Sequence, residues 1–583
     1  MAAIRRGSYP QVEPRAVDLM TPAVAEIPPA LPIGDARRLA HRRGARLLVV
    51  REATGRDPAW RGVTPGTLDH AHALGLGRAP VRVALWETPV IEPRMPEVAV
   101  RRLLRSGAPG ALLLERGRPR GAVLRETGIL AGLPGSLRAA LDRLPEEART
   151  LLREAAWAAS ESGLDVWLVG GVVRDLALGI TGASRDLDLV VEGDARRVAR
   201  RLARRLGGGV REHAAFLTAT VEAPHRPRLD LATARAERYR RPGALPEVAP
   251  AAIREDLWRR DFSINALAIG LRGDRWGQVL DPTGGLDDLG RRQLRILHPL
   301  SFVEDPTRGL RAVRLAGRLG FRLEASTARL LREALRLDVY AALSADRLRA
   351  EWRRVLAEPA PATVLAGLAR AGALPLLGLE APFGPPSQIR LARLARRTAR
   401  LPLSADTREA LAVLALASDA GEPAVERMTQ RLGLPPRSAA ALAGARAMAP
   451  SLLDRLAAAS GFGSACAMLD GTPEAVAAWG LILASPGLVA RRLGRYLRVW
   501  SGGTVTQPLL GGDDVRKLGL APGPRVGVLL RAARAAQLSG RIRTRTAALR
   551  WLRRQTAVPG ARAAPPSTSR RSPDDPQRKG GVV

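Results

Sequence analysis

Two aspartates at positions 186 and 188 are the residues of this chain best suited to catalysis. Asp186 and Asp188 open the apolar run 189–191, and alternate side chains of a strand share a face, so both carboxylates point the same way. Carboxylate oxygens are the ligands that hard divalent cations prefer. The pair therefore predicts a magnesium site, although a lone Asp-x-Asp in a charged chain is more often a solvated loop.

A glycine pair, Gly170 and Gly171, follows the apolar run 167–169 and precedes the aspartates. Glycine lacks Cβ, so the backbone there can come close to a bound group, for which phosphate is well suited. Arg174 offers a planar fork of donors for phosphate oxygens, and Asp175 could hold that fork in place. A glycine pair alone is usually a turn, but this order of strand, turn, helix and strand favours a site for a nucleotide and magnesium.

Further candidate residues lie downstream of the aspartate pair. Asp230, in another apolar strand, could bring a third carboxylate beside the pair; a structural ion pair is the alternative. In the segment 259–266, Arg260 suits phosphate and Asp261 suits a ribose hydroxyl, just before an expected apolar helix. These residues extend the predicted site from the metal to the whole nucleotide.

Arginine recurs at every third position after Asp305, at Arg308, Arg311 and Arg314, and Pro306 suits the first turn of a helix. The three arginines therefore form a stripe on one helix face. A solvated arginine face is the alternative, but the opposite face is apolar, which places the stripe at an interface with the α/β domain or with water. Asp305 and Arg308, one turn apart, could present complementary donors and acceptors to the edge of a base.

The elements that must position these residues follow a degenerate internal repeat in the first 135 residues. The segment 21–24 is echoed by 88–91, and each copy continues with a helical segment, an apolar strand and a second strand led by Gly62 or Gly121. This resembles a pair of CBS modules, which stack as a pseudo-dimer and often bind adenosine nucleotides. Members that bind nucleotide usually place Thr three and Asp six residues after that glycine. Those positions hold Pro65 and Leu68 in one copy and Leu124 and Thr127 in the other, so a structural role is favoured over ligand binding.

The expected fold class is α/β plus all-α. Apolar strands and short helices alternate up to about residue 300, whereas from Ser301 onward strand signals nearly vanish and Leu, Ala and Arg recur at helical spacing. The predicted domains are an N-terminal extension (1–14), the tandem CBS-like pair (15–135), an α/β domain with a helical entry (136–300), a helical neck with the arginine stripe (301–385), a helical body and tail (386–558) and a disordered basic tail (559–583).

The composition favours a nucleic-acid partner. Lys plus Arg number 92 against 56 Asp plus Glu, and the formal net charge of +36 attracts polyanions; codon usage that favours Arg is the alternative source of part of this charge. Cys466 is the single cysteine, so no intrachain disulfide can form, and its apolar surroundings predict inert core. No apolar run approaches the ~18 residues of a membrane span. A cytoplasmic protein without membrane contact is expected.

Together these motifs resemble the class II tRNA nucleotidyltransferase and bacterial poly(A) polymerase family, over roughly residues 150–550. The resemblance implies a polymerase-β-like palm followed by helical neck, body and tail domains that hold the acceptor end of tRNA. It implies that Asp186 and Asp188 bind magnesium, in a two-metal site. By the same resemblance, the nucleotide would be contacted by Gly170, Gly171, Arg174, Arg260 and Asp261, and selected by Asp305 and Arg308 with Arg311 and Arg314 beside them.

The function that this resemblance implies is addition of CCA, or of its terminal A alone, to tRNA 3′ ends from ATP and possibly CTP. Poly(A) polymerase is the first alternative, and a catalytically decayed RNA-binding protein is a less favoured one, because two adjacent like charges repel unless a metal neutralises them. Base selection would also involve a flexible loop near 239–250. A homo-oligomer through the CBS-like pair is possible. Long relatives carry a DHH-type phosphoesterase region before the CBS modules, and no such chemistry is expected of these residues.

Overall fold

The computed structural model describes residues 14–52, 59–125, 135–180, 186–244, 246–337, 339–380, 383–501 and 507–556. The chain divides into two compact units, residues 1–395 with 412–435 and residues 396–411 with 436–583. Nearly all of the predicted N-terminal extension and the whole predicted disordered tail lie outside the described residues. Within the described part, no helix combines the length and apolar character that crossing a membrane requires.

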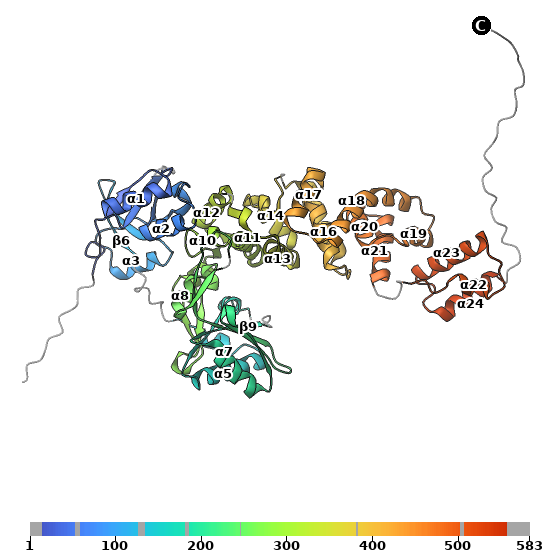
Figure 1. The fold of residues 1–583 in the computed structure, drawn as a ribbon, viewed down its shortest axis with the longest axis horizontal. Helices are drawn as coiled ribbons and strands as arrows, with labels where there is room; N and C mark the ends of the chain where they lie inside the picture. Colours follow the sequence, from blue (N-terminus) through green and yellow to red (C-terminus); the bar gives the residue numbers. More distant parts are fainter. Residues whose placement is uncertain are drawn as a thin grey trace, which may run out of the picture. The chain divides into compact units, whose positions relative to one another are not determined.

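The N-terminal part of the first unit is built from two copies of one order of elements (Figure 1). Its elements are β1 (Val24–Glu26), α1 (Ile33–Arg43), β2 (Leu47–Glu52), β3 (Ala59–Val63), α2 (Pro65–Ala73), η1 (Val81–Ala84), β4 (Trp86–Glu87), α3 (Glu97–Leu104), β5 (Gly110–Glu115) and β6 (Arg118–Leu124). In each copy a parallel contact precedes an antiparallel strand pair. The first copy has β1 against β2, and the second has a parallel bridge from Val90 to Leu112.

The two copies exchange backbone pairing. Thr21, at the start of the first copy, bridges to Ala122 in the last strand of the second copy. Reciprocally, β4 at the start of the second copy pairs with β3 of the first. The repeat predicted from the sequence is therefore a repeat of structure, and each copy completes the other's sheet. Thr127, one of the positions considered for ligand binding, lies outside the described residues.

An eight-stranded sheet in the order β10-β11-β12-β9-β8-β15-β16-β7 forms the next part of the first unit. Its strands are β7 (Gly135–Ser136), β8 (Asp165–Val169), β9 (Asp186–Glu192), β10 (Gly209–His213), β11 (Thr218–Glu222), β12 (Arg228–Thr233), β15 (Ala268–Gly270) and β16 (Gln278–Leu280). The β12–β9 pair is parallel and the other pairs are antiparallel.

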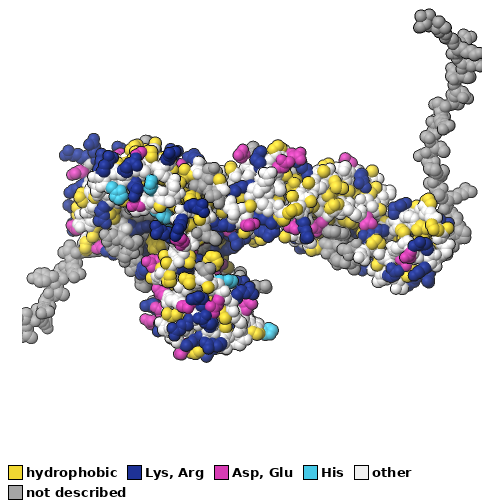
Figure 2. Space-filling model, in the orientation of Figure 1, with side chains coloured by type: hydrophobic (Ala, Val, Ile, Leu, Met, Phe, Trp, Pro, Cys, Tyr) yellow, Lys and Arg dark blue, Asp and Glu magenta, His cyan; other side chains and the backbone are white. Residues whose placement is uncertain are grey.

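Helices cover this sheet and fix its edges. They are α4 (Arg138–Leu141), α5 (Glu146–Ser160), α6 (Gly171–Ala177), α7 (Ala195–Leu206), α8 (Ile253–Trp258) and α9 (Gly285–Gly290), with the short turns η2 (Ala214–Phe216), η3 (Ser263–Asn265) and η4 (Gly273–Arg275). The carboxylate of Asp194 caps the start of α7, Gly207 ends it in a left-handed conformation, and its apolar face packs on the sheet. Figure 2 shows Lys and Arg side chains gathered over the region of α5 and α7.

Two sequence predictions about this region are wrong. The apolar run after Asn265 forms strand β15, not a helix, because it pairs antiparallel with the buried strand β8 on one side and with β16 on the other. The stretch after Ser301 is not wholly helical either, since the two-residue strand β18 (Arg322–Leu323) pairs with β17 (Gln293–Leu294). A small hairpin of β13 (Arg235–Arg238) and β14 (Glu247–Pro250) occupies the segment predicted as a flexible loop, and Leu245 in it is not described.

Apart from β18, the remaining elements of the described residues are helices. The first unit continues with α10 (Ser301–Glu304), α11 (Thr307–Leu319), α12 (Ala325–Arg336), η5 (Val339–Ala342), α13 (Ala345–Ala357), α14 (Pro361–Arg370), η6 (Leu374–Leu377), α15 (Pro385–Thr398), α16 (Ala405–Ala417), η7 (Ser418–Ala420) and α17 (Glu422–Arg431), of which α15 and α16 also contribute residues to the second unit. Helices of the second unit are α18 (Pro436–Ala457), α19 (Phe462–Leu469), α20 (Glu474–Leu483), α21 (Leu488–Ser501), α22 (Gly512–Arg516), α23 (Pro524–Leu538) and α24 (Arg545–Thr556). Cys466 is buried, as predicted, and burial raises the pKa of its thiol to about 11.

Candidate active site

A glycine turn joins β8 to α6 and lies against the aspartate strand. Gly170 has a φ of 78°, which L side chains rarely adopt, and a Cβ there would lie 3.2 Å from Oδ2 of Asp188. Because β8 and β9 run antiparallel with Val169 opposite Asp188, the end of one strand carries the turn and the start of the other carries the carboxylate. The predicted strand, turn, helix and strand unit is confirmed by the structure.

Arg174 is almost fully buried beneath this turn. Its Nε and Nη2 donate to Oδ1 of Asp175 at 2.9 and 2.7 Å, so Asp175 holds the guanidinium as the sequence predicted. Nη1 donates to Oδ1 of Asn265 at 2.9 Å, a partner that the sequence analysis missed. A Cβ on Gly171 would lie 3.3 Å from Nη2, so the guanidinium packs directly under the glycine backbone.

The aspartate strand β9 runs parallel to β12, and their register places Asp230 beside Asp188. Asp188 is exposed. The backbone of Asp186 pairs with Arg228, and its side chain is not described. Asp230 lies at the predicted place for a third carboxylate, but its Oδ1 also accepts from Oγ1 of Thr220 at 2.5 Å and from Nη2 of Arg228 at 3.2 Å. Both interpretations of Asp230 therefore have geometric support.

A cavity of about 360 Å³ lies over these strands and is lined by Asp188, Asp230 and Arg260 among others. Among the residues with described side chains, no three of His, Cys, Asp or Glu group closely enough to hold a metal ion. Two neighbouring carboxylates nevertheless offer the hard oxygen donors that magnesium requires, and strand alternation puts Asp186 on the face of Asp188. The donor chemistry fits a divalent cation.

Arg260 reaches this cavity because a buried carboxylate holds it there. Asp256 on α8 is fully buried, and its Oδ2 accepts from Nη2 of Arg260 at 2.9 Å while its Oδ1 accepts from Arg259. Burial alone would raise the pKa of Asp256, but the two guanidinium charges outweigh it and lower the pKa. Sequence analysis missed Asp256; its position four residues before Arg260 on a helix was the available signal.

Asp261, predicted to bind a ribose hydroxyl, is engaged by protein donors. Oδ1 accepts from the Phe262 backbone N–H at 2.8 Å and from Nδ2 of Asn265 at 3.0 Å. Oδ2 lies 3.2 Å from Nη1 of Arg311, so the carboxylate connects the α/β domain to helix α11. Although burial opposes the charged form, the pKa of Asp261 is lowered by the charge of Arg311 and by the bond from Asn265.

Helix α11 carries the arginine stripe into an interface. Nη1 of Arg308 donates to Oγ of Ser301 at 2.8 Å and its Nη2 donates to the Arg259 carbonyl at 2.9 Å. Nη2 of Arg311 lies 3.3 Å from Glu351 on α13, and Arg314 pairs with Glu351 and Glu358. The fully solvated alternative is therefore wrong, and the interface with the α/β domain that the apolar opposite face required is present.

Asp305 precedes this helix and caps its first turn. Its Oδ1 accepts from the backbone N–H of Thr307 at 3.0 Å, from the hydroxyl of Thr307 at 2.6 Å and from Nη2 of Arg347 at 2.8 Å. Asp305 and Arg308 are both buried against the palm. Asp305 and Arg308 lie one helical turn apart as predicted, but both are engaged by protein partners, and their reading of a base edge stays a prediction.

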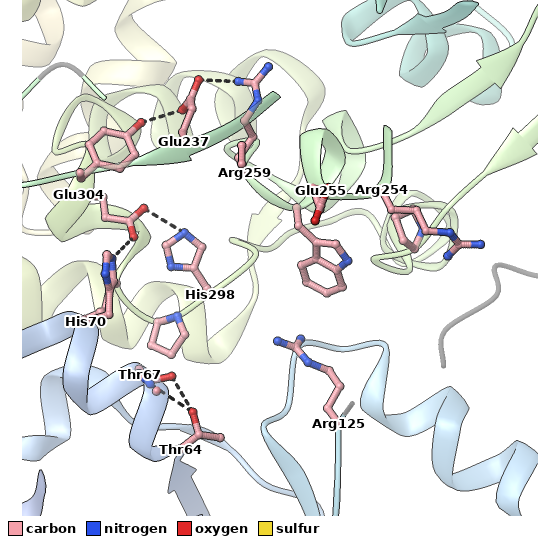
Figure 3. Close-up of a pocket in the computed structure, with 17 residues that line it drawn as sticks. Thr64, Thr67, His70, Arg125, Glu237, Arg254, Glu255, Arg259, His298 and Glu304 are labelled. Atoms are coloured by element: carbon pink, nitrogen blue, oxygen red, sulfur yellow. Dashed lines mark hydrogen bonds and ion pairs between the residues drawn. The ribbon is translucent and has the colours of Figure 1, made fainter. Parts of the chain in front are cut away.

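A second cavity, of about 680 Å³, is lined by residues of the N-terminal repeat, of the α/β domain and by Glu304 of α10 (Figure 3). At its edge the carboxylate of Glu304 is held between two histidines, His70 at 2.7 Å and His298 at 3.2 Å. Across the cavity the guanidinium of Arg125 lies over the ring of Trp258, 4.6 Å from its centroid. Sequence analysis identified none of these residues.

The chain matches known proteins over the regions described above. Residues 166–295 match the family model of the poly(A) polymerase head domain. An A-adding tRNA nucleotidyltransferase of Aquifex aeolicus is 47% identical over 195 residues, which cover 33% of this chain and 23% of the relative. A CC-adding tRNA nucleotidyltransferase of Deinococcus radiodurans is 37% identical over 380 residues, covering 65% of this chain and 86% of the relative.

Solved structures agree with these relatives. The structure of a CCA-adding enzyme in apo form II has a TM-score of 0.60 and 28% sequence identity, covering 73% of this chain and 100% of that chain. Complexes of CCA-adding enzymes with CTP, with ATP and with tRNA are also similar. The chain spans less than half the length of the A-adding relatives, 23%, 42% and 26%. Because it spans most of the CC-adding relative, it belongs to the class II tRNA nucleotidyltransferase family, with a poly(A) polymerase head domain.

Proposed function

We propose that this protein transfers nucleotides to the 3′ end of tRNA. It adds either CCA, from CTP and ATP, or the terminal A alone, from ATP. The observation that carries the proposal is the pairing of Asp188 with Asp230 across β9 and β12, at the glycine turn and beside Arg260. The family supports it, and so do the nucleotide and tRNA complexes of the similar CCA-adding enzymes.

In this mechanism Asp186 and Asp188 would hold magnesium, with Asp230 as a third carboxylate. When bound, magnesium would supply positive charge that acidifies the terminal hydroxyl and neutralises the phosphates. The backbone at Gly170 and Gly171 admits the triphosphate, and Arg260 holds its oxygens with the support of Asp256. The tRNA 3′-oxygen bonds to the α-phosphorus in line as the bond to the bridging oxygen breaks, pyrophosphate leaves, and the hydroxyl proton passes to solvent.

In this proposal the base is selected by Asp305 and by Arg308 of helix α11. Asp305 and Arg308 offer an acceptor and donors one turn apart, and Arg311 and Arg314 hold the helix against the palm and α13 through their ion pairs. Asp261 takes part by fixing Arg311, in addition to the ribose contact inferred from the sequence. Arg174 supports the glycine turn from below through Asp175 and Asn265, and can donate its remaining hydrogens to phosphate.

The proposed domains keep the boundaries inferred from the sequence. Residues 15–135 form a CBS-like pair, supported by the exchanged strands of the two copies. Residues 136–300 form the palm, 301–385 the neck, and 386–558 a body and tail that bind tRNA, which the net charge of +36 favours. The CBS-like pair is proposed as a structural module through which two copies of the chain could associate.

Incubation with defined tRNAs tests the proposal. tRNA lacking CCA, tRNA ending in CC and an unrelated RNA are each given CTP, ATP or both with Mg²⁺, and products are read by mass. Three additions to tRNA lacking CCA identify CCA synthesis, whereas one A on tRNA ending in CC identifies A addition. Addition of two C and no A would match the CC-adding relative instead. Long A tracts on the unrelated RNA would favour poly(A) polymerase, and no incorporation on any RNA would contradict the proposal.

A further inference from the structure

The N-terminal repeat contacts the residue immediately before Asp305. His70, on α2 of the first copy, places its Nε2 2.7 Å from Oε1 of Glu304, the last residue of α10 (Figure 3). On the other side Nε2 of His298 lies 3.2 Å from Oε2 of Glu304. Each oxygen of the carboxylate therefore contacts a histidine, one from the repeat and one from the segment that precedes α10.

Glu304 is a buried carboxylate that stays charged. It is 8% exposed. Burial alone would raise its pKa, but His298, His70 and Arg308 reverse that effect and leave the pKa well below its usual range. A charged, buried carboxylate that loses one of its partners must move or take up a new donor, because an unpaired buried charge is costly. The position of Glu304 is thus sensitive to His70.

The backbone of Glu304 passes this constraint to Asp305. Its carbonyl accepts from the N–H of Gly243, at the tip of the β13–β14 hairpin, at 3.0 Å. Arg347 bridges the same two segments, donating to the Gly243 carbonyl at 2.7 Å and to Oδ1 of Asp305 at 2.8 Å. Glu304, Gly243, Arg347 and Asp305 therefore form one closed ring of contacts, and a shift at Glu304 displaces the residue that follows it.

Other contacts attach the repeat to α12 and to the α/β domain without His70. Nε of Arg82 lies 3.2 Å from Oε2 of Glu333 on α12, and Nη1 of Arg295 donates to the Ser106 carbonyl at 3.0 Å. Arg329 of α12 donates to the Arg82 carbonyl at 3.0 Å. Loss of His70 should consequently leave the repeat docked, so that the contact with Glu304 can be tested separately from attachment.

We propose that His70 is a positioning residue for nucleotide selection, through which the N-terminal repeat fixes the placement of Asp305 and Arg308. The inference rests on the proposed function, since it assigns base selection to these two residues. It gives the repeat a role in the choice between ATP and CTP without requiring that the repeat bind a ligand.

The test compares His70→Ala, His70→Gln and His72→Ala in the full chain. His72 is the matched control, an exposed histidine on the same helix. Kd for ATP and for CTP is measured by calorimetry with Mg²⁺, and kcat and KM for each nucleotide are measured on tRNA. In His70→Ala the ratio of ATP to CTP affinity is expected to change about tenfold. The melting temperature should stay close to that of wild type, because His298 and Arg308 remain as partners of Glu304. His70→Gln, which keeps a donor, should restore most of the ratio, and His72→Ala should match wild type.

An unchanged ratio of ATP to CTP affinity in His70→Ala overturns the inference. A His70→Gln variant with the same altered ratio as His70→Ala also overturns it, because the effect would then not depend on the hydrogen bond to Glu304. A changed ratio with normal kcat supports it. Failure of wild type to bind either nucleotide would instead contradict the proposed function, and with it the selection that His70 would position. The measurement of nucleotide binding therefore distinguishes a failure of this inference from a failure of the proposed function.

Discussion

Charged side chains are arranged differently at the strand edge that carries Asp188 and on the arginine helix α11. At the edge, Asp188 is exposed and Asp230 lies beside it in register, and both carboxylates line a cavity together with Arg228, the ion-pair partner of Asp230. On α11, Arg311 is matched by Asp261 and by Glu351 of α13, and Arg314 by Glu351 and by Glu358 just after that helix. The edge carboxylates therefore face a cavity, whereas the arginines of α11 are engaged within an interface.

This difference suggests a catalytic role for the strand edge and a positioning role for the helix. Adjacent carboxylates repel and are tolerated where a cation can neutralise them, which favours a catalytic role for the edge. Matched pairs at a partly buried interface add little net stability, but they fix geometry, since removing one partner leaves a charge unpaired. We therefore expect substitutions at the edge to abolish turnover with little effect on folding, and substitutions in the helix network to affect stability and selection.

The largest effect is expected at the open edge. Asp188→Asn should lower nucleotide incorporation by about 10³-fold, because several kcal/mol of charge stabilisation depend on the bound metal. Binding of tRNA should change less than twofold, as judged by filter binding beside the incorporation assay. Asp194→Asn is the control, since Asn caps a helix as well as Asp does. Normal turnover by Asp188→Asn would remove the metal-site assignment.

Substitution of Asp230 tests whether the site at the strand edge contains a third carboxylate. If it is a third carboxylate of the site, Asp230→Asn lowers kcat by about 10- to 100-fold, whereas Arg228→Gln, which removes its ion-pair partner, has little effect. The steady-state rate with saturating ATP and Mg²⁺ measures both. Equal small effects of the two variants would show that Asp230 serves the ion pair alone.

Breaking the closed network should cost stability. Arg311→Met leaves Asp261 and Glu351 without a shared cation and is expected to lower the free energy of unfolding by about 2 kcal/mol, less than for a fully buried pair because a third of the side chain is exposed. Urea denaturation followed by circular dichroism measures the change. Arg318→Met, at the exposed end of the same helix, should be near neutral. A neutral Arg311→Met would show that the network does not hold α11.

The smallest effect is a pH dependence of the same network. The folded-state pKa of Asp261 is lowered from 3.8, so its stabilising contribution is full above about pH 4 and is lost as pH falls through the folded value. The melting temperature of wild type should consequently fall more steeply below pH 4 than that of Asp261→Asn. Scanning calorimetry in steps from pH 6 to pH 3 compares the two. Parallel curves would contradict the assignment of the lowered pKa to this carboxylate.

Sequence reasoning succeeded where the signal was local. The glycine turn, Arg174 held by Asp175, and the helix begun after Pro306 follow from residues within a few positions of one another. It failed at the run after Asn265, because a short apolar run suits a helix or a strand and the choice was made by pairing with β8. It also missed Asp256, whose importance appears once two arginines converge on it.

Spacing and periodicity along the chain were enough to predict the order of motifs, the N-terminal repeat and the mainly helical C-terminal half. Tertiary structure alone decided that Asp230 lies beside Asp188, since sheet order brings β12 next to β9. It also decided that His70 meets Glu304, 234 positions away. Contacts at such distances depend on how whole elements pack, which no local pattern encodes.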